Sequence, residues 1–369
     1  PSYDDLYRNA FVHTRARAYK ERGLEVDVFR LRPEQPISWH EFEGVDVTTG
    51  SSEALRRTFV SGGYRHIAVH FLDADMWAVL QEHVGCVQIT VWIHGAEIHP
   101  WWRRKYNLET DDDVARAKVQ SEGRIAFWKK VFSSATPSLR FVFVSNSFAE
   151  EVMEDFDLKL PESRYRVVNN PIDTDLFHYD PKPDSQRFRF LSIRPYASRQ
   201  YANDLTVEAI CLLKDKPIFS KLSFKLIGDG RLFDRTISPL LGLSNVEIER
   251  RFLDQGEISA LHKHYGVFLC PTRWDSQGVS RDEAMSSGLV PISSRVAAVP
   301  EFVDESCGLL VEAEDAQGIA DAIETIAGDC QLFRRLSAAA ASRVETERSK
   351  RIIIEKELAL LNRREPSDA

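Results

Sequence analysis

The chain has 369 residues, a formal net charge of −8 at pH 7, 43% hydrophobic residues and 28% charged residues. The length favours two domains, because single cores seldom grow beyond about 250 residues, and two domains imply a cleft. The acidic balance argues against nucleic acid as a partner, and no run approaches the roughly 18 apolar residues of a spanning helix. We therefore expect a globular two-domain protein.

The first half alternates apolar runs with amphipathic stretches, the pattern of strand–helix–strand units in parallel sheets. Its predicted strands span residues 24–29, 66–72, 87–93 and 140–145, with helices between them. A first α/β domain is therefore expected over residues 1–179.

Residues 170–186, NPIDTDLFHYDPKPDSQ, are the best candidate linker because they hold three prolines and four aspartates. The boundary is placed near residue 180, and the second domain is expected over residues 180–341. Residues 342–369 are expected to form a long, charged helical tail that could run back to the first domain.

The second half repeats the alternating pattern. Strands are predicted over residues 188–193, 223–227, 246–248, 266–270, 290–293 and 308–311, and helices over 201–213, 256–264 and 316–326. These elements predict a second doubly wound, Rossmann-like parallel sheet.

Five cysteines, at positions 86, 211, 270, 307 and 330, are odd in number and widely spaced. Segments such as GVFLCP surround them with apolar residues, so they are predicted to be buried, reduced thiols. This favours a cytoplasmic location.

The segment WDSQGVSRDEAMSSGLVP, residues 274–291, carries the clearest chemistry. A predicted strand, a loop, Gly278 and a predicted helix follow one another, which places a helix N-terminus at the carboxyl edge of a parallel sheet. Such an end can bind a phosphate, and Asp275 and Glu283 on its two sides could accept hydrogen bonds from ligand hydroxyls. Two other interpretations stay open: Ser280 and Glu283 have the spacing of a capping box, and Asp275 could bond its own backbone.

The run PTRWDSQGVSRDEAMSSGLVPISSRVAAVPE, residues 271–301, resembles the C-terminal signature of retaining glycosyltransferases of the GT-B fold, glycosyltransferase family 4. VWIHGAEI, VSNSFAEEV, VVNNPIDTDLF, LSIRPYASRQ and KLIGDGRLFDR agree with further family segments in the same order. The resemblance covers nearly the whole chain and implies two Rossmann-like domains facing a cleft.

The resemblance implies roles for the residues around the glycine turn. Glu283 is expected to hold the ribose hydroxyls of the nucleotide, and Asp275 to reach hydroxyls of the donor sugar. The backbone N–H groups of Gly278 and Val279 are expected to meet the diphosphate or the sugar. Asp275 departs from the family pattern, which has a glutamate at this position, and RVAAVPE has alanines where paired glycines are usual.

The resemblance also assigns residues outside this turn. Arg194 matches the family arginine on the diphosphate, and Arg199 stands where a lysine is usual. Gly228 and Gly230 match the Gly-Asp-Gly turn of the donor site, and His94 matches a histidine that contacts the donor sugar. Without the resemblance, the two arginines could be ordinary surface residues and His94 a structural strand-end histidine.

The acceptor side is less specific. HPWWRRKYN, residues 99–107, mixes aromatic and basic side chains, so Trp101, Trp102 and Arg103 could stack on sugars or meet anionic lipid headgroups at the membrane surface. The alternative is an ordinary amphipathic segment with aromatic residues in the core and solvated cations.

The activity implied is transfer of a hexose from a nucleotide diphosphate sugar to a glycan or lipid-linked acceptor, with retention and without a cofactor. HGAEIH offers His94, Glu97 and His99 as possible metal ligands, but no further cluster of histidine or cysteine completes a site. No metal is expected, because arginines and a helix N-terminus can neutralise the phosphates. The alternative is a non-catalytic module that binds a sugar nucleotide or glycan; an epimerase and a phosphorylase are minor alternatives. Members of the family begin with a strand and a glycine-rich loop, and both precede the segment that is matched here from residue 11. We therefore expect either that the chain is part of a longer polypeptide or that this first strand is supplied from elsewhere.

Overall fold

The structure is a computed structural model that describes residues 10–134 and 136–361. The chain forms two compact units. Unit 1 is built from residues up to Arg103, from Val114–Asn169 and from Ile353 onward; unit 2 is built from Arg104–Asp113 and Asn170–Ile352. Residues 170–179, assigned to the first domain from sequence, belong to unit 2. The expectation of a missing first strand concerns the start of the chain, where residues 1–9 lie outside the described residues.

Unit 1 contains a parallel sheet in the order β4-β5-β6-β7. The strands are β4 (His66–His70), β5 (Gln88–Ile93), β6 (Leu139–Phe143) and β7 (Tyr165–Val167). Neighbouring residues of a strand point to opposite faces, and helices cover both faces. Phe132 of α4 (Asp111–Ser133) packs against Phe141 on one face, while Ile353 of α13 (Lys350–Leu361) packs near Val142 on the other.

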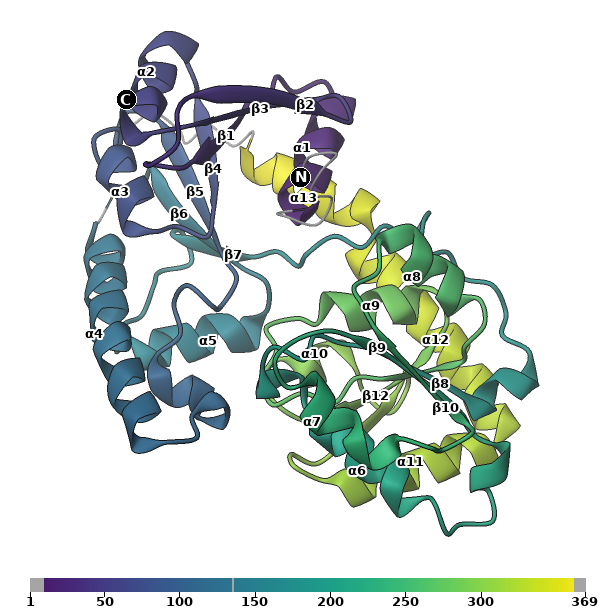
Figure 1. The fold of residues 1–369 in the computed structure, drawn as a ribbon. Helices are drawn as coiled ribbons and strands as arrows, with labels where there is room; N and C mark the ends of the chain where they lie inside the picture. Colours follow the sequence, from purple (N-terminus) through teal and green to yellow (C-terminus); the bar gives the residue numbers. More distant parts are fainter. Residues whose placement is uncertain (1–9, 135, 362–369) are drawn as a thin grey trace. The chain divides into compact units, whose positions relative to one another are not determined.

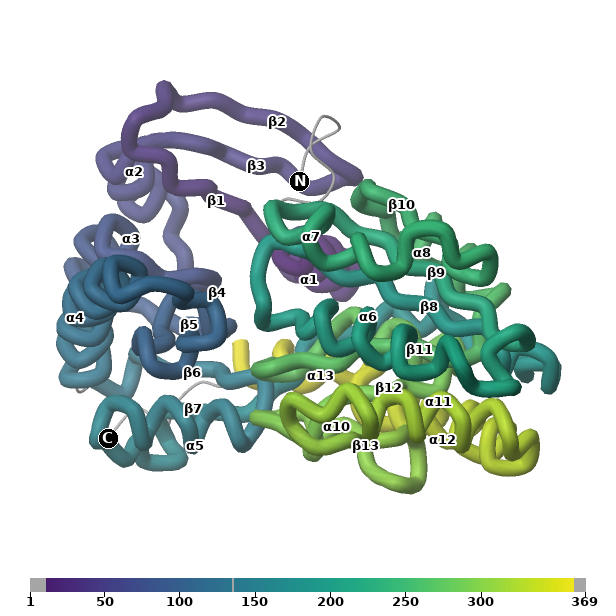
Figure 2. The backbone as a smooth tube through the Cα atoms, turned by 60° about the horizontal axis from the view of Figure 1, so that its bottom comes forward, coloured from purple at the N-terminus to yellow at the C-terminus, as the bar shows by residue number. Residues whose placement is uncertain are grey.

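A second, smaller sheet in unit 1 has the order β1-β3-β2. Its strands are β1 (Val28–Leu31), β2 (Ser38–Phe42) and β3 (Val45–Gly50). β1 and β3 are parallel, whereas β2 and β3 form the antiparallel hairpin seen in Figure 2. This hairpin is absent from the sequence-based expectations. The other helical elements that begin in unit 1 are α1 (Ala10–Glu21), α2 (Ser52–Gly62), α3 (Ala74–Leu80), the 3-10 segment η1 (Trp101–Asn107) and α5 (Asn146–Asp155).

Unit 2 is built on a six-stranded sheet in the order β10-β9-β8-β11-β12-β13, in which all neighbours are parallel. Counted along the unit, this is the 3-2-1-4-5-6 order of a dinucleotide-type Rossmann sheet, and the strand order reverses between β8 and β11. The strands are β8 (Arg189–Ile193), β9 (Ser223–Gly228), β10 (Val246–Arg250), β11 (Val267–Leu269), β12 (Val290–Ser294) and β13 (Leu309–Val311).

Helices cover both faces of this sheet, as Figure 1 shows for unit 2. α6 (Asn203–Leu212) and α11 (Ala316–Gly328) pack on one face, and α8 (Gln255–His262) and α9 (Val279–Ser286) pack on the other. The remaining helical elements are α7 (Phe233–Ile237), α10 (Val299–Phe302), α12 (Cys330–Arg348), η2 (Asp184–Phe188), η3 (Arg199–Tyr201), η4 (Phe219–Lys221) and η5 (Ser238–Leu240). The predicted α/β fold with parallel sheets in both halves is confirmed.

The C-terminal tail is two helices rather than one. α12 ends at Arg348 and α13 starts at Lys350. The break has a physical cause, because the Lys350 amide donates to the Ile172 carbonyl at 2.7 Å and the Ile172 amide donates to the Arg348 carbonyl at 2.9 Å. These bonds replace the helical ladder at Ser349. Residues 362–369 of the expected tail lie outside the described residues.

The cysteines correct another expectation. Cys270 and Cys307 are buried, but Cys86 is exposed and Cys211 and Cys330 are half-buried; all five are free thiols. The apolar letters around a cysteine do not report which face of its element it occupies. Within the described ranges, no helix combines the length and the apolar character that crossing a bilayer requires.

Candidate functional site

The switch point of the unit 2 sheet gathers five of the residues predicted from sequence. Arg194 directly follows β8, and the loop after β11 carries Asp275 and leads through Gly278 into α9, which holds Val279 and Glu283. Crossover helices leave the two strands on opposite faces at such a point, so a crevice opens at the carboxyl edge of the sheet. These residues therefore share one edge of one sheet.

Gly278 sets the start of α9. It is the N-cap residue with a φ of 92°, in the left-handed region, and a Cβ there would lie 2.8 Å from the Arg281 guanidinium. No side chain among the described residues caps this helix end. Ser280 is the second helical residue, so the capping-box interpretation of Ser280 and Glu283 is wrong. The amides of the first turn of α9 therefore remain available to an anion.

Arg194 brings a buried positive charge to this turn. Its side chain is 5% exposed, and its Nη1 donates to the Ser280 Oγ at 2.9 Å. The guanidinium lies 4.9 Å from the centre of the Tyr201 ring, and its Nε is buried with no hydrogen-bond partner among the described residues. A buried cation with an unused donor suits an anionic ligand such as a phosphate.

The two carboxylates differ in their surroundings. Glu283 is 9% exposed, and the described residues give its side chain no hydrogen-bond donor. Burial and, secondarily, the charge of Asp282 raise the pKa of Glu283 to about 8. Asp275 is half-buried, and its Oδ1 accepts a bond of 3.3 Å from the Gln277 amide, as the structural interpretation of Asp275 anticipates. Of the two, Glu283 is thus the carboxyl group that has no hydrogen-bond donor within residues 10–134 and 136–361.

The Gly-Asp-Gly turn packs directly against the backbone of Arg194 and the residues that follow it. A Cβ on Gly228 would lie 1.9 Å from the Arg194 carbonyl oxygen, and one on Gly230 would lie 2.3 Å from the Ala197 nitrogen. The carboxylate of Asp229 accepts bonds from the Gly230 amide and from Arg250. The glycines therefore let the end of β9 approach the loop after β8, a structural requirement visible without any ligand.

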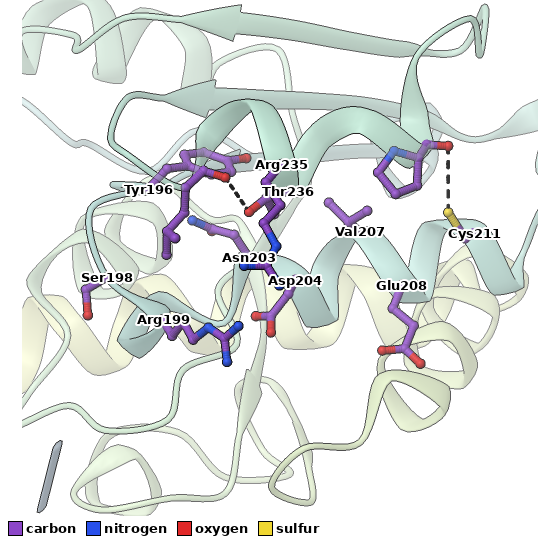
Figure 3. A pocket seen from close by; sticks show the side chains of 12 residues that line it. Tyr196, Ser198, Arg199, Asn203, Asp204, Val207, Glu208, Cys211, Arg235 and Thr236 are labelled. Carbon is purple, nitrogen blue, oxygen red and sulfur yellow. Dashed lines mark hydrogen bonds between the residues drawn. The ribbon is translucent and has the colours of Figure 1, made fainter. Parts of the chain in front are cut away.

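Arg199 points toward a different feature. Its Nη2 lies 3.2 Å from Glu109, and it lines a hollow of about 460 Å³ between α6 and α7. Figure 3 shows Ser198 and Arg199 at one end of this hollow and Cys211 at the other. Arg194 and Glu283 are not part of the lining. The contacts of Arg199 are thus with Glu109 and this hollow, and its role at the diphosphate stays a prediction.

His94 lies in unit 1, at the end of β5. Its Nε2 is 3.0 Å from the Nδ1 of His70, which ends the neighbouring strand β4, and the Phe11 ring lies 5.0 Å from its own. Burial and the nearby Arg15 charge lower the pKa of His94 to about 3, so the imidazole is neutral at physiological pH. His70 was missed from sequence, although two histidines ending adjacent strands are a readable signal.

The candidate metal ligands His94, Glu97 and His99 do not form a metal site. Glu97 Oε1 accepts the His94 amide at 2.6 Å, and burial raises the pKa of Glu97 to about 7. The His99 Nε2 instead lies 3.2 Å from Glu151. Across the residues that the structure describes, no three His, Cys, Asp or Glu side chains are grouped to hold a metal ion.

The aromatic and basic segment is engaged within unit 1. Arg103 Nε donates to both carboxylate oxygens of Asp155, at 3.0 and 3.1 Å, and Trp102 Nε1 donates to Asp155 at 3.2 Å. The Lys118 Nζ lies 5.0 Å from the centre of the Trp101 ring. Arg103 is therefore paired rather than solvated, and Trp102 is 39% exposed rather than part of the core, so the structure does not match the amphipathic interpretation. The acceptor-side role of Trp101, Trp102 and Arg103 stays a prediction.

The sequence comparisons match the part of the chain that holds these residues. Residues 188–329, which hold Arg194, Asp275, Gly278 and Glu283, match the family model described as Glycosyl transferases group 1. A relative that is 26% identical over 194 residues, half of each chain, is a GDP-mannose:cellobiosyl-diphosphopolyprenol alpha-mannosyltransferase of Xanthomonas oryzae pv. oryzae. The matched region covers at most about half the length of the curated relatives.

Solved structures show the same fold. Sucrose-phosphate synthase from Thermosynechococcus elongatus superposes with a TM-score of 0.76 at 18% identity, covering 96% of this chain and 92% of that one. HepE from Anabaena, in complex with UDP and glucose, gives a TM-score of 0.69 at 12% identity over 95% of both chains. The solved structures therefore show that the chain has the GT-B fold, and its residues 188–329 match the glycosyl transferases group 1 family.

Proposed function

We propose that this chain transfers a hexose from a nucleotide diphosphate sugar to a glycan or lipid-linked acceptor, with retention of configuration and without a metal ion. One observation carries the proposal. The buried Arg194 is bonded to Ser280 in the uncapped first turn of α9, and Glu283, three residues further on, is a buried carboxyl group without a hydrogen-bond donor.

Each group has a role that its chemistry supports. Arg194 and the amides of Gly278 and Val279 would hold the diphosphate and stabilise the charge that develops on it as the glycosidic bond breaks. Glu283 would accept the ribose hydroxyls, which supply the donors that its carboxyl group lacks. Asp275 would accept a hydroxyl of the donor sugar.

The chemical step that fits these residues is attack by the acceptor hydroxyl on the same face from which the nucleotide leaves. The new bond to the anomeric carbon forms as the bond to the phosphate oxygen breaks, and the departing phosphate takes the acceptor proton. The protein then contributes positioning and electrostatic stabilisation rather than a nucleophile. His94 is retained as a donor-sugar contact and Arg199 as a diphosphate contact, on the resemblance alone.

The names of the similar proteins suggest which substrates to test first. The Xanthomonas relative is named for GDP-mannose and a diphosphopolyprenol-linked acceptor, and HepE was solved with UDP and glucose. We therefore place GDP-mannose first and UDP-glucose second as donors. A lipid-linked acceptor would place the reaction in the cytoplasm at the inner face of a membrane. The transferase relatives do not favour the non-catalytic alternative.

A thermal-shift titration with GDP, UDP, GDP-mannose and UDP-glucose in EDTA tests the binding half. A nucleotide at 100 times its Kd should stabilise the native state by about 2.7 kcal/mol. Glu283→Ala should lose this stabilisation, whereas Glu305→Ala, which removes an exposed carboxylate, should keep it. Transfer or slow hydrolysis of the donor tests the catalytic half, and Asp275→Ala should reduce it. If the wild-type protein binds the donor but neither transfers nor hydrolyses it, the proposed enzymatic activity is contradicted.

A further inference from the structure

Four buried polar side chains of unit 2 meet at the first turns of α9. We call them the Asp282 cluster: Gln277, Arg281, Asp282 and Arg348. They are 1%, 2%, 0% and 1% exposed, respectively. Gln277 precedes the glycine turn, Arg281 and Asp282 lie on α9, and Arg348 ends α12.

Asp282 is the centre of the cluster. Its Oδ1 accepts bonds from the Nε and Nη2 of Arg281 at 3.2 and 2.8 Å. Its Oδ2 accepts a bond from the Gln277 Nε2 at 3.1 Å and lies 3.5 Å from the Arg348 Nε. The guanidinium carbons of Arg281 and Arg348 both lie over the Phe302 ring, at 5.2 and 5.3 Å from its centre. Both oxygens of Asp282 are therefore engaged.

The cluster shapes the glycine turn of the donor site. Arg281 Nη2 donates to the Gln277 carbonyl, and its guanidinium occupies the space where a Cβ of residue 278 would lie. Asp282 also directly precedes Glu283 on α9. The backbone from Gln277 to the first turn of α9 is thus held on its inner side by groups that would not touch a ligand.

The cluster also contacts the segments next to the two places where the chain passes between the units, Asn169–Asn170 and Ile352–Ile353. The Gln277 side chain brackets Asn170, accepting its amide at 2.6 Å and donating to its carbonyl at 3.2 Å. Arg348, a member of the cluster, accepts the Ile172 amide at its carbonyl, and Ile172 accepts the Lys350 amide. We call residues 170–173 and 348–350 the crossing segments.

Stability alone is a weak explanation for this arrangement. Buried ion pairs are often no more stable than well-packed apolar residues of similar volume, because desolvation offsets the attraction. What such a network provides is one geometry, since Gln277 and Arg281 bond to both oxygens of Asp282 and a rearrangement would leave these buried groups without partners. The Arg348 Nε and Nη2 have no hydrogen-bond partner among the described residues, so Arg348 contributes its charge, at 3.5 Å from Asp282. Here that geometry joins the donor-site turn to both crossing segments.

We propose that Asp282 is a positioning residue: its cluster fixes the Gly278 turn in the shape that holds the donor diphosphate and couples that turn to the two crossing segments. The inference rests on the proposed nucleotide-sugar site. Occupation of the turn by a nucleotide would therefore tighten residues 170–173 and 348–350, which no ligand group needs to touch.

Hydrogen exchange with and without GDP or UDP tests the coupling. In the wild type, the nucleotide should slow exchange in peptides covering residues 275–283 and also in both crossing segments, by about fivefold or more. In Asp282→Asn the response of the crossing segments should fall below about twofold, and nucleotide affinity should drop by about tenfold. Gln277→Met, which keeps the Arg281–Asp282 pair, gives a second variant if Asp282→Asn does not fold.

Asp304→Asn is the matched control. The Asp304 carboxylate pairs at 2.6 Å with Arg343, which lies on α12 as Arg348 does but outside the Asp282 cluster. Removing this charge should leave the response of the crossing segments to nucleotide unchanged. Nucleotide protection confined to residues 275–283 in the wild type would overturn the inference. So would a response of the crossing segments that is equal in Asp282→Asn and Asp304→Asn. Absence of any nucleotide binding to the wild type would instead contradict the proposed function.

Discussion

Replacing Glu283 by glutamine makes the electrostatics of the site measurable without a substrate. The native state holds the Glu283 proton up to a pKa of about 8, because burial and Asp282 disfavour the anion. The unfolded chain loses the same proton near the ordinary value of about 4.5. As pH rises between these values, the unfolded state has fewer bound protons, so wild-type stability must fall. Glutamine is neutral throughout, so the variant lacks this slope.

The size of the effect follows from the pKa difference. One pKa unit corresponds to about 1.4 kcal/mol, so ionised Glu283 costs the native state about 5 kcal/mol. Relative to wild type, Glu283→Gln should therefore gain stability steadily from pH 5 to pH 8 and level off above pH 9. A nucleotide whose ribose hydroxyls donate to the carboxylate would favour its ionised form. Binding at pH 7 should then release close to one proton in the wild type and none in the variant.

Urea denaturation at a series of pH values measures the difference in unfolding free energy between wild type and variant, and this subtraction removes the titration of all other groups. Calorimetry in buffers of different ionisation enthalpy counts the protons released on binding GDP or UDP. Glu305→Gln, at a fully exposed carboxylate, should give a flat difference over the same range. Parallel stability curves for wild type and Glu283→Gln would refute the buried, unpartnered carboxyl group.

Three further substitutions test other parts of the structure. Gly228→Ala, whose Cβ would lie 1.9 Å from the Arg194 carbonyl, should cost about 2 to 4 kcal/mol, seen as a lower Tm; an unchanged Tm would contradict the close packing of this turn. Ser280→Ala should cost no more than about 1 kcal/mol but weaken nucleotide binding severalfold by calorimetry, because it frees the Arg194 guanidinium; equal affinity would count against that contact. Glu357→Gln should destabilise unit 1 by about 3 kcal/mol in denaturant melts, since it leaves the buried Arg15 without its charged partner at 2.9 Å; a loss below about 1 kcal/mol would show that this pair is not needed.

Periodicity and glycine placement were sufficient to predict most strands of both parallel sheets and the turn at Gly278. The β2–β3 hairpin was not predicted, because no helix separates its two strands and it therefore breaks the alternating strand–helix pattern. The break at Ser349 was also missed. It depends on bonds to Ile172, which lies far away in sequence, and no local preference reports such a partner.

The candidate site, like the fold, could be predicted from the sequence only in part. The strand–loop–helix order around Gly278 was enough to place Gly278 and Glu283 at one sheet edge, whereas Arg194 was expected there only through the resemblance. The capping-box alternative for Ser280 stayed open because spacing alone cannot reveal that Arg194 reaches its hydroxyl. Asp282 was overlooked because adjacent charges on a helix usually face solvent, whereas here the pairing of Asp282 with Arg281 and Arg348 is buried.

The most direct test of the central claim is a crystal structure of the protein with GDP-mannose or UDP-glucose bound. We predict phosphate oxygens within about 3.2 Å of the Arg194 guanidinium and of the amides of Gly278 or Val279, with a ribose hydroxyl at a similar distance from Glu283. A nucleotide bound only in the hollow beside Arg199, or anywhere that leaves Arg194 and Glu283 without contact, would contradict the account.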